Sequence, residues 1–147
     1  MIEKHGNIFN EVGQCDALCI TTNGALRKNG NGICGAGIAK QARDKWGFIE
    51  KRLGKSIKKH GNKVMPLLID NNTTIVAFPT KEHWKDNSNI DLISESCSCL
   101  YELTNALNWS RVCLPRPGCM NGNLSWYLVK PILSNILTDD RFEIYYV

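Results

Sequence analysis

The chain has 147 residues, of which 43% are hydrophobic and 22% are charged, and its formal net charge is +4. This composition is typical of a globular domain and excludes disordered and fibrous classes. The length predicts a single domain over residues 1–147. The mild charge does not favour a dedicated duplex-DNA binder, and no apolar run is long enough to span a bilayer, so we expect no membrane association.

The N-terminus and the cysteines predict a cytoplasmic protein. Residues 1–5 (MIEKH) lack the apolar core of a secretory signal. Seven cysteines are an odd number and show no paired Cys-x-x-Cys spacing, which argues against a disulfide framework and against a zinc site. We expect most of these thiols to be buried and reduced. The three histidines lack metal-ligand spacing, so we predict neither a metal nor a cofactor.

The first predicted elements alternate between strand and helix. A short apolar run over 16–22 predicts a buried strand, and a Gly- and Asn-rich loop follows over 23–37. Two helices are predicted next, over 38–46 and 48–59, and Gly61 marks the end of the second.

Positive charge is concentrated in the second predicted helix, at Lys51, Arg52, Lys55, Lys58 and Lys59. The simpler interpretation, which we favour from sequence alone, is a solvated helix face. The alternative is a nucleic acid or another phosphate-rich partner.

A hairpin is predicted from two strands over 63–69 and 73–78, because the turn residues Asp70-Asn71-Asn72 lie between them. Pro79 is expected to close the second strand.

The second half of the chain predicts two further helices and two further strands. Ser88 and Asp91 form a capping-box pattern ahead of a long amphipathic helix. The apolar stripe of this helix consists of Ile90, Ile93, Cys97, Leu100, Leu103 or Thr104, and Leu107. Then come a strand over 111–115, an irregular loop over 116–123, a helix over 124–137 that contains Pro131, and a strand over 142–147. This order predicts an α/β fold, a three-layer α/β/α sandwich with a mixed, largely parallel central sheet.

Two loops, over 23–37 and 116–123, follow apolar strands and precede helices. Glycines in such loops let backbone N–H groups approach phosphate oxygens, and the helix N-terminus adds a favourable dipole. Two such loops in one small domain predict a diphosphate held between them. The chain has no nucleotide-triphosphatase loop and no Gly-x-Ser-x-Gly elbow, and the Gly-x-Gly-x-x-Gly spacing at 30–35 lies too far past its strand for a dinucleotide fingerprint.

At four places the chain resembles the macro domain family. Residues 5–8 (HGNI) are similar to its opening Gly-Asp-Ile, and residues 16–23 (DALCITTN) to its strand-to-loop signature DAIVNAAN. Residues 35–39 (GAGIA) match its GxGIA, and residues 115–126 (PRPGCMNGNLSW) resemble its second loop, PxxGCGxGGLxW. The order and spacing of these matches make the resemblance specific over nearly the whole chain. It implies the macro-domain fold and ADP-ribose, or a derivative of it, as the small-molecule ligand.

Residues 78–84 (FPTKEHW) are similar to the FPTKxHW of macro domains that remove ADP-ribose from DNA in a toxin–antitoxin pair. Other branches of the family remove ADP-ribose from protein carboxylates or dephosphorylate ADP-ribose-1''-phosphate. The resemblance leaves these branches open, and it implies ADP-ribosylated DNA or protein as partners.

The resemblance also implies which residues act on the ligand. Asn23 corresponds to the asparagine that hydrogen-bonds the distal ribose, and Lys81 to a catalytic lysine of the DNA- and glutamate-directed branches. A lysine can attack or stabilise an anomeric carbon if desolvation keeps its amine neutral. The alternatives are a turn residue for Asn23 and an exposed loop residue for Lys81. The implied ligand-binding residues are Asn7, Ile8, Gly35, Ala36, Gly37, Ile38, Thr80, Pro117, Gly118, Cys119, Met120, Asn121, Gly122, Asn123, Leu124 and Tyr145.

Several departures from the family pattern bear on activity. Asn7 replaces an aspartate that usually receives the adenine amino group, so adenine selectivity is expected to be weaker. Met120 replaces a glycine, Gly122 stands where one hydrolase branch has an aspartate, and Ile20 stands where the phosphatase branch has a histidine.

Two classes of function therefore remain at this stage. The first is a metal-independent hydrolase, expected to be monomeric, that removes ADP-ribose from a conjugate, with dephosphorylation of ADP-ribose-1''-phosphate as a variant. The second is a non-catalytic module that binds ADP-ribose or a signalling nucleotide. Lys81 favours the hydrolase, whereas Met120 and the missing acidic residue favour the binding module.

Overall fold

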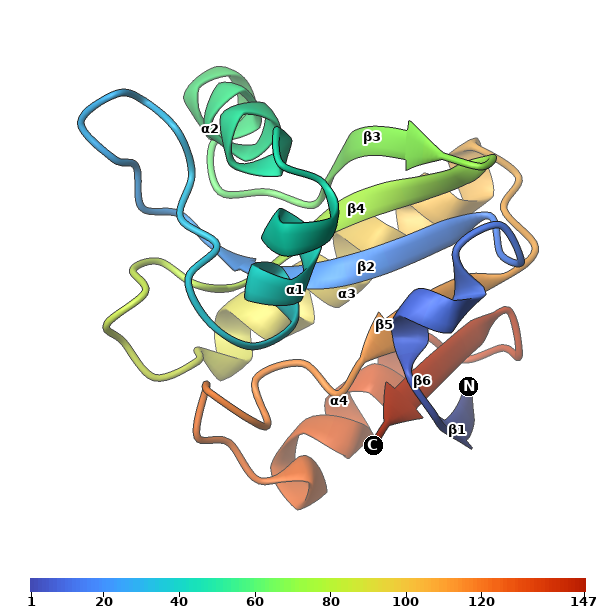
Figure 1. The fold of residues 1–147 in the computed structure, drawn as a ribbon. Helices are drawn as coiled ribbons and strands as arrows, with labels where there is room; N and C mark the ends of the chain where they lie inside the picture. Colours follow the sequence, from blue (N-terminus) through green and yellow to red (C-terminus); the bar gives the residue numbers. More distant parts are fainter.

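The computed structural model describes residues 1–147 and contains one sheet with helices on both of its faces (Figure 1). In chain order the elements are β1 (Ile2–His5), the 3-10 turn η1 (Ile8–Glu11), β2 (Ala17–Asn23), α1 (Gly37–Lys45), α2 (Ile49–His60), β3 (Met65–Asp70), β4 (Thr73–Lys81), α3 (Ile90–Ala106), β5 (Val112–Pro115), α4 (Trp126–Ile136) and β6 (Phe142–Tyr146). No helix has the length and apolar character needed to cross a membrane.

The strand order in the sheet is β1-β6-β5-β2-β4-β3. All neighbours pair in parallel except β3 and β4, which form the predicted antiparallel hairpin. Asn71 and Asn72 at its turn have φ values of 51° and 66°. Asparagine tolerates this left-handed region of backbone conformation. Two consecutive residues in it form a tight two-residue turn whose twist matches that of the paired strands. The predicted mixed, largely parallel sheet is confirmed.

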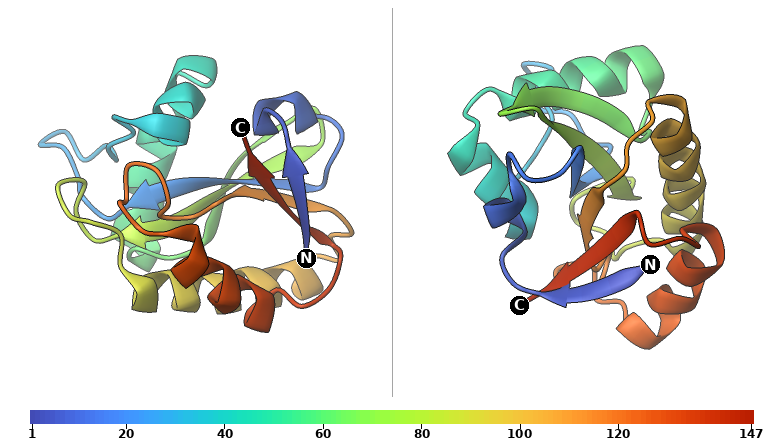
Figure 2. Two further views of the ribbon diagram at one scale, coloured as in Figure 1. Left: turned by 90° about the horizontal axis from the view of Figure 1, so that it is seen from below. Right: turned by 90° about the vertical axis from the view of Figure 1, so that its right-hand side faces the viewer.

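Helices cover both faces of the sheet, so the predicted three layers are also confirmed. α1, α2 and η1 lie on one face, and α3 and α4 lie on the other (Figure 2). Successive side chains of β2 enter opposite cores: Leu18 and Ile20 pack toward α1 and α2, whereas Ala17 and Cys19 pack toward α3 and α4. A strand that is buried on both faces needs apolar side chains on each of them. This explains why the residues of β2 from Ala17 to Ile20 are all apolar.

The ends of the sheet contain two differences from the prediction. β1 was not predicted, because Glu3 and Lys4 interrupt any apolar pattern, yet it pairs with β6 at the edge. β4 does not close at Pro79 but continues to Lys81. β3 pairs with β4 only as far as Ala77, so Pro79 lies beyond the paired region on that side, where a missing N–H is tolerated.

The N-terminus of α3 was predicted one residue too early. Asn89, not Ser88, is the N-cap, and its side chain accepts the Leu92 N–H at 3.0 Å. Of the two alternatives in the predicted stripe, Thr104 is fully buried and Leu103 is not, and the Thr104 hydroxyl donates to the Leu100 carbonyl. Ile90 and Leu107, at the two ends of the predicted stripe, are exposed, because the sheet covers only the middle of the helix. The last helix starts at Trp126, two residues later than predicted, behind the N-cap Ser125.

All seven cysteines are free thiols, and five of them are buried. Burial of most thiols is therefore confirmed.

Candidate functional site

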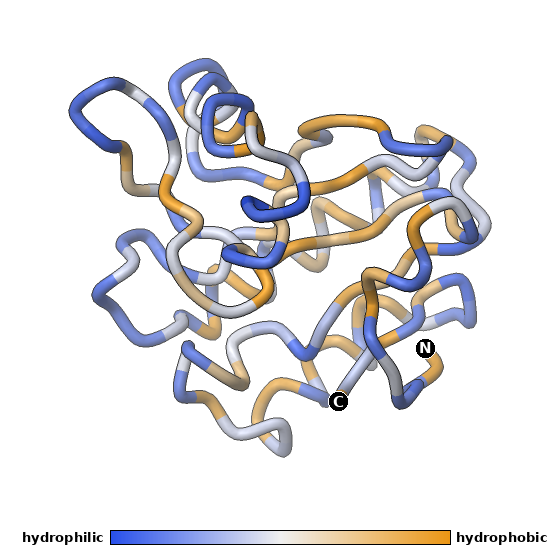
Figure 3. Tube along the Cα trace, in the orientation of Figure 1, coloured by the Kyte–Doolittle hydropathy of each residue, from blue (hydrophilic) through white to orange (hydrophobic).

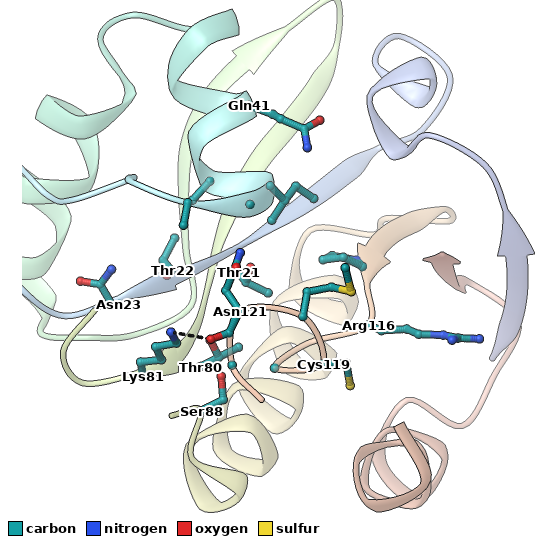
Figure 4. Close-up of a pocket in the computed structure, with 18 of the residues that line it drawn as sticks. Thr21, Thr22, Asn23, Gln41, Thr80, Lys81, Ser88, Arg116, Cys119 and Asn121 are labelled. Carbon is teal, nitrogen blue, oxygen red and sulfur yellow. Dashed lines mark hydrogen bonds between the residues drawn. The ribbon is translucent and has the colours of Figure 1, made fainter. Parts of the chain in front are cut away.

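The main cavity of the molecule lies where the parallel strands end, and it has a volume of about 1150 Å³ (Figure 4). The carboxyl ends of β2, β4 and β5 reach it together with two loops, the first loop (residues 24–36) and the second loop (residues 116–125). Ligands of open α/β sheets bind at this edge. The cavity is larger than an ordinary small-molecule pocket needs to be, and it suits an elongated ligand.

The structure brings nearly all of the predicted site residues to this cavity. Those that line it are Lys81, Asn23, Asn7, Ile8, Gly35, Ala36, Gly37, Ile38, Thr80, Gly118, Cys119, Met120, Asn121, Gly122 and Tyr145. Pro117, Asn123 and Leu124 do not line it. Asn123 hydrogen-bonds Asn87, and Leu124 donates its N–H to the Gly118 carbonyl, so both stabilise the second loop from outside.

Asn23 and Lys81 are direct neighbours in the sheet. They are register partners at the carboxyl ends of β2 and β4, where a bulge follows Thr22. Asn23 is 8% exposed. Its side-chain amide donates to the Ile33 carbonyl and accepts the Ala25 N–H, which holds both ends of the first loop. Asn23 is thus the last residue of β2, and its side chain stabilises the first loop.

The Lys81 amine donates to the main-chain carbonyl of Asn121 at 3.3 Å (Figure 4). Because Lys81 ends a strand, its main chain is held by the sheet while its side chain reaches toward the second loop. It is thus a strand residue rather than the exposed loop residue of the alternative prediction. The side chain of Asn121 in turn lies beside Gly37, the first residue of α1.

The N-terminus of α1 is built to face a ligand. Gly37 has a φ of +57°, and a Cβ there would lie 2.5 Å from the Asn121 amide nitrogen. The N-cap Ala36 has no side chain that bonds the first-turn N–H groups, and residues 35–37 are exposed. The free N–H groups at this end offer donors and a favourable dipole to an anion.

Two buried hydroxyl groups in the cavity wall lack any partner. These are Thr22 Oγ1 and Ser88 Oγ, in residues that are 4% and 7% exposed. Ser88 lies against the second loop, where a Cβ on Gly122 would come within 2.0 Å of its oxygen. Buried hydroxyl groups normally have a hydrogen-bond partner, so these two are exceptions at the cavity wall.

The other end of the cavity lies beside η1 and β6. Asn7 caps η1, and its side-chain oxygen already accepts the Phe9 N–H at 3.0 Å. The Tyr145 hydroxyl points away from solvent and donates to Glu11 at 2.6 Å. Burial and the hydrogen bonds to Glu11 and Glu143 raise the pKa of Tyr145. Tyr145 therefore offers the cavity its ring and not a free hydroxyl.

Sequence reasoning missed several lining residues, among them Thr22, Arg27, Trp84, Ser88 and Arg116. A signal existed for three of them: Thr22 immediately precedes Asn23 at a strand end, Arg116 opens the second loop, and Trp84 ends the FPTKEHW segment. Ser88 was predicted as a helix cap and not as a lining residue, and nothing in the sequence singled out Arg27.

Arg116 forms the wall beside β6. Its guanidinium lies over the rings of Tyr146 and Trp126, at 4.3 and 4.9 Å from the centroids, and bonds Glu3. Its charge is therefore held on the β6 side of the cavity, away from Lys81 (Figure 4). No group of three or more His, Cys, Asp or Glu side chains comes together in a way that could hold a metal ion.

The sequence matches no protein-family profile. One curated protein is similar, the "DNA ADP-ribosyl transferase-DNA ADP-ribosyl glycohydrolase fusion protein" of Thermosipho africanus (strain H17ap60334), at 30% identity over 89 residues. The match covers 60% of this chain, which spans only 22% of the length of that fusion protein.

Several solved structures share the fold. The macrodomain of Mycobacterium tuberculosis DarG is 25% identical, with a TM-score of 0.81 and coverage of 99% of this chain and 97% of that chain. Thermosipho africanus DarTG, solved in complex with ADP-ribose, has a TM-score of 0.81 at 23% identity and covers 98% of this chain and 41% of its own. The macrodomain of Thermus aquaticus DarG has a TM-score of 0.80 at 22% identity and covers 98% of this chain and 95% of its own.

The resemblance read from the sequence is thus confirmed in three dimensions. The chain has the fold of a macrodomain, and its structural neighbours include the macrodomains of DarG proteins.

Proposed function

We propose that this chain binds ADP-ribose in the cavity between the two loops and hydrolyses an ADP-ribosyl conjugate, with ADP-ribosylated DNA as the first candidate substrate. The observation that carries the proposal is the pairing of Asn23 and Lys81 in one register at the cavity floor. The likeness to the fusion protein named for DNA ADP-ribosyl glycohydrolase activity supports DNA as the substrate.

The cavity supports a specific orientation of the ligand. The diphosphate would lie between the N-terminus of α1 and the second loop, where N–H groups are free. The adenosine would lie toward Asn7 and Tyr145, and the distal ribose toward Asn23 and Lys81. This orientation brings the scissile bond at the anomeric carbon within reach of the only lysine that lines the cavity.

The chemistry needs little from the protein beyond this arrangement. Hydrolysis adds a hydroxyl group from water to the anomeric carbon, and the released base takes a proton. Asn23 would hold the distal ribose, and Lys81 would attack or stabilise the anomeric carbon. We propose that turnover is metal-independent, in a monomer of the reducing cytoplasm.

A second candidate is a binding module without turnover. Two observations favour it: the Lys81 amine is already engaged by the Asn121 carbonyl, and Gly122 offers no carboxylate. In that case the lysine would close the second loop over the ligand and perform no chemistry.

One experiment separates these candidates. Purified protein is offered ADP-ribosylated single-stranded DNA, ADP-ribosylated protein and ADP-ribose-1''-phosphate, each with and without a chelator. We expect release of free ADP-ribose from the DNA conjugate, unaffected by the chelator. Binding of ADP-ribose with a Kd of about 1 μM or below, without turnover of any conjugate, would establish the binding module. Absence of binding at millimolar ADP-ribose would refute both.

A further inference from the structure

The charges of the chain are segregated along the sequence. Residues 24–63, the basic segment, hold eleven of the eighteen Lys and Arg residues but only two of the fourteen Asp and Glu residues. The basic segment therefore has a formal charge of +9, whereas the rest of the chain has −5. The modest net charge of the whole chain conceals this difference.

In the structure the basic segment lies on one side of the molecule (Figure 1). It consists of the first loop, α1 and α2, and the tip of the loop and much of α2 are hydrophilic (Figure 3). Few of its cations are neutralised: only Arg27, Arg43 and Lys63 have a carboxylate partner. All four lysines of α2, Lys51, Lys55, Lys58 and Lys59, are exposed and form no ion pair.

Packing joins α2 to the first loop, which reaches the cavity. Gly54 of α2 lies directly against the first loop, since a Cβ there would be 2.1 Å from the Gly30 carbonyl. The Lys58 amine also lies at Gly30, and Arg27 of the same loop lines the cavity. Just after α2, Asn62 donates to the Lys81 carbonyl at 2.9 Å. The segment that carries the lysines of α2 is therefore joined both to the first loop and to the end of β4.

An exposed aromatic side chain stands at the rim of the same cavity. Trp84 is 49% exposed and lines the cavity from the loop after β4. This loop is joined to the first loop and to α2, because Gly24 donates to the Glu82 carbonyl and Asn62 to the Glu82 side chain. Exposed tryptophan beside a basic track is the combination that single-stranded nucleic acids require, since unpaired bases stack on aromatic rings while phosphates follow positive charge.

From this arrangement we infer that α2 and the first loop form a docking surface for the phosphate backbone of a single-stranded nucleic acid, with Trp84 stacking on a base beside the cavity. The inference rests on the proposed function, because the docked strand is the one that carries the ADP-ribose. It also makes a separate claim, since the surface should bind an unmodified strand.

The test uses a quadruple variant, Lys51→Gln, Lys55→Gln, Lys58→Gln and Lys59→Gln, and an unmodified single-stranded oligonucleotide followed by fluorescence anisotropy at several salt concentrations. We expect the wild-type protein to bind and the variant to bind at least about tenfold more weakly. The slope of log K against log salt should fall by about 0.7 for each phosphate that the variant no longer neutralises. Trp84→Ala should weaken binding without changing this slope, because stacking releases no counterions.

A control variant separates a local effect of charge on α2 from a general effect of net charge. Lys4→Gln with Lys130→Gln removes two positive charges outside the basic segment and is compared with Lys55→Gln and Lys59→Gln. Thermal melting verifies that each variant folds, and calorimetry with ADP-ribose should give an unchanged Kd for the quadruple variant.

The outcomes distinguish this inference from the proposed function. If the wild type binds ADP-ribose but no oligonucleotide, or if both double variants lose equal affinity, the docking surface is refuted while the cavity assignment stands. Binding of the wild type to anionic phospholipid vesicles in place of the oligonucleotide would refute it as well. If the oligonucleotide binds as expected but ADP-ribose does not, the proposed function fails and the surface remains.

Discussion

Lys81 is the residue on which the choice between enzyme and binding module depends. Its main chain is fixed by β4, and its amine contacts the second loop beside Asn23. We expect Lys81→Ala to remove most turnover of ADP-ribosylated DNA while the ADP-ribose Kd changes by less than about tenfold, roughly 1.4 kcal/mol. A residue that acts mainly on bond breaking lowers the rate more than the affinity. Single-turnover kinetics and calorimetry measure the two effects.

Lys81→Arg is the informative companion variant. Arginine keeps the positive charge but is not deprotonated in proteins, so it can stabilise charge and cannot supply a neutral amine. Full turnover in Lys81→Ala would show that the lysine is only a rim residue.

The hydroxyl of Ser88 gives a second test at the same scale. Because Ser88 Oγ has no partner in the protein, Ser88→Ala leaves no broken hydrogen bond behind. We expect unchanged thermal stability and an ADP-ribose affinity weaker by about 1 kcal/mol, the usual net contribution of one hydrogen bond.

Ser96 is a matched control for this variant. It is equally buried, but its hydroxyl donates to the Pro79 carbonyl at 2.8 Å. Ser96→Ala should therefore lower the melting temperature and leave the ADP-ribose affinity unchanged. The opposite pattern in the two variants would show that the unpartnered hydroxyl does not face the ligand.

At the scale of elements, the packing of α2 against the first loop determines where that loop lies. Gly54 lies within α2, where alanine is favoured over glycine by about 1 kcal/mol through helix propensity. A Cβ at Gly54, however, would lie 2.1 Å from the Gly30 carbonyl and 2.8 Å from Asn31 Cα, and both are backbone atoms that cannot rotate away. The steric effect should exceed the propensity gain.

We therefore expect Gly54→Ala to lower the free energy of unfolding and to weaken ADP-ribose binding, because the displaced loop leads into the N-terminus of α1. Gly47→Ala is the control, since a Cβ there has no atom within 4 Å. Denaturant titration and calorimetry of both variants provide the measurement. Equal stability of the two variants would contradict the close contact.

The sequence predicted best those elements whose burial is uniform. The first four residues of β2, Ala17–Ile20, are all apolar because both faces of the strand are covered, and the hairpin turn is specified by Asn71 and Asn72 themselves. β1 could not be predicted in this way, because an edge strand of four residues with two charges has no periodic pattern. Its partner β6 supplies the pairing that its own residues do not indicate.

The same distinction holds for the site. Glycine- and asparagine-rich loops, together with the family resemblance, located most of the lining residues. Ser88 was assigned instead to a helix cap, because the local pattern could not show that Asn89 takes that position and that Ser88 packs against Gly122, over thirty positions later. Contacts between distant segments, such as that of Lys58 with Gly30, could not be predicted from local sequence patterns, because they form only when the chain folds.

At the scale of the whole molecule, one buried network joins the N-terminal and C-terminal parts. Glu143 on β6 accepts hydrogen bonds from Arg111, at 2.9 Å, and contacts Lys4 on β1 at 2.8 Å. Arg111 also contacts Glu11 of η1, the turn that carries Asn7 and Ile8 to the cavity. The network thus connects the sheet edge to one wall of the site.

This network predicts how stability depends on pH. Burial raises the Glu143 pKa, but hydrogen bonds from Arg111 and Lys4 outweigh burial and lower the pKa to about 2, from 4.5. A carboxyl group whose pKa is lower in the folded state stabilises the protein above its unfolded pKa, and this stabilisation is lost as the pH falls from 4.5 toward 2. For Glu143 alone the loss between pH 7 and pH 3 is about 2 kcal/mol. Urea titrations at the two pH values should show a smaller difference for Glu143→Gln than for the wild type, because glutamine does not titrate. Asp140→Asn, at an exposed carboxylate near the N-terminus, should retain the full wild-type difference. A Glu143→Gln protein with an unreduced pH dependence would show that the network does not hold the carboxylate in its charged form.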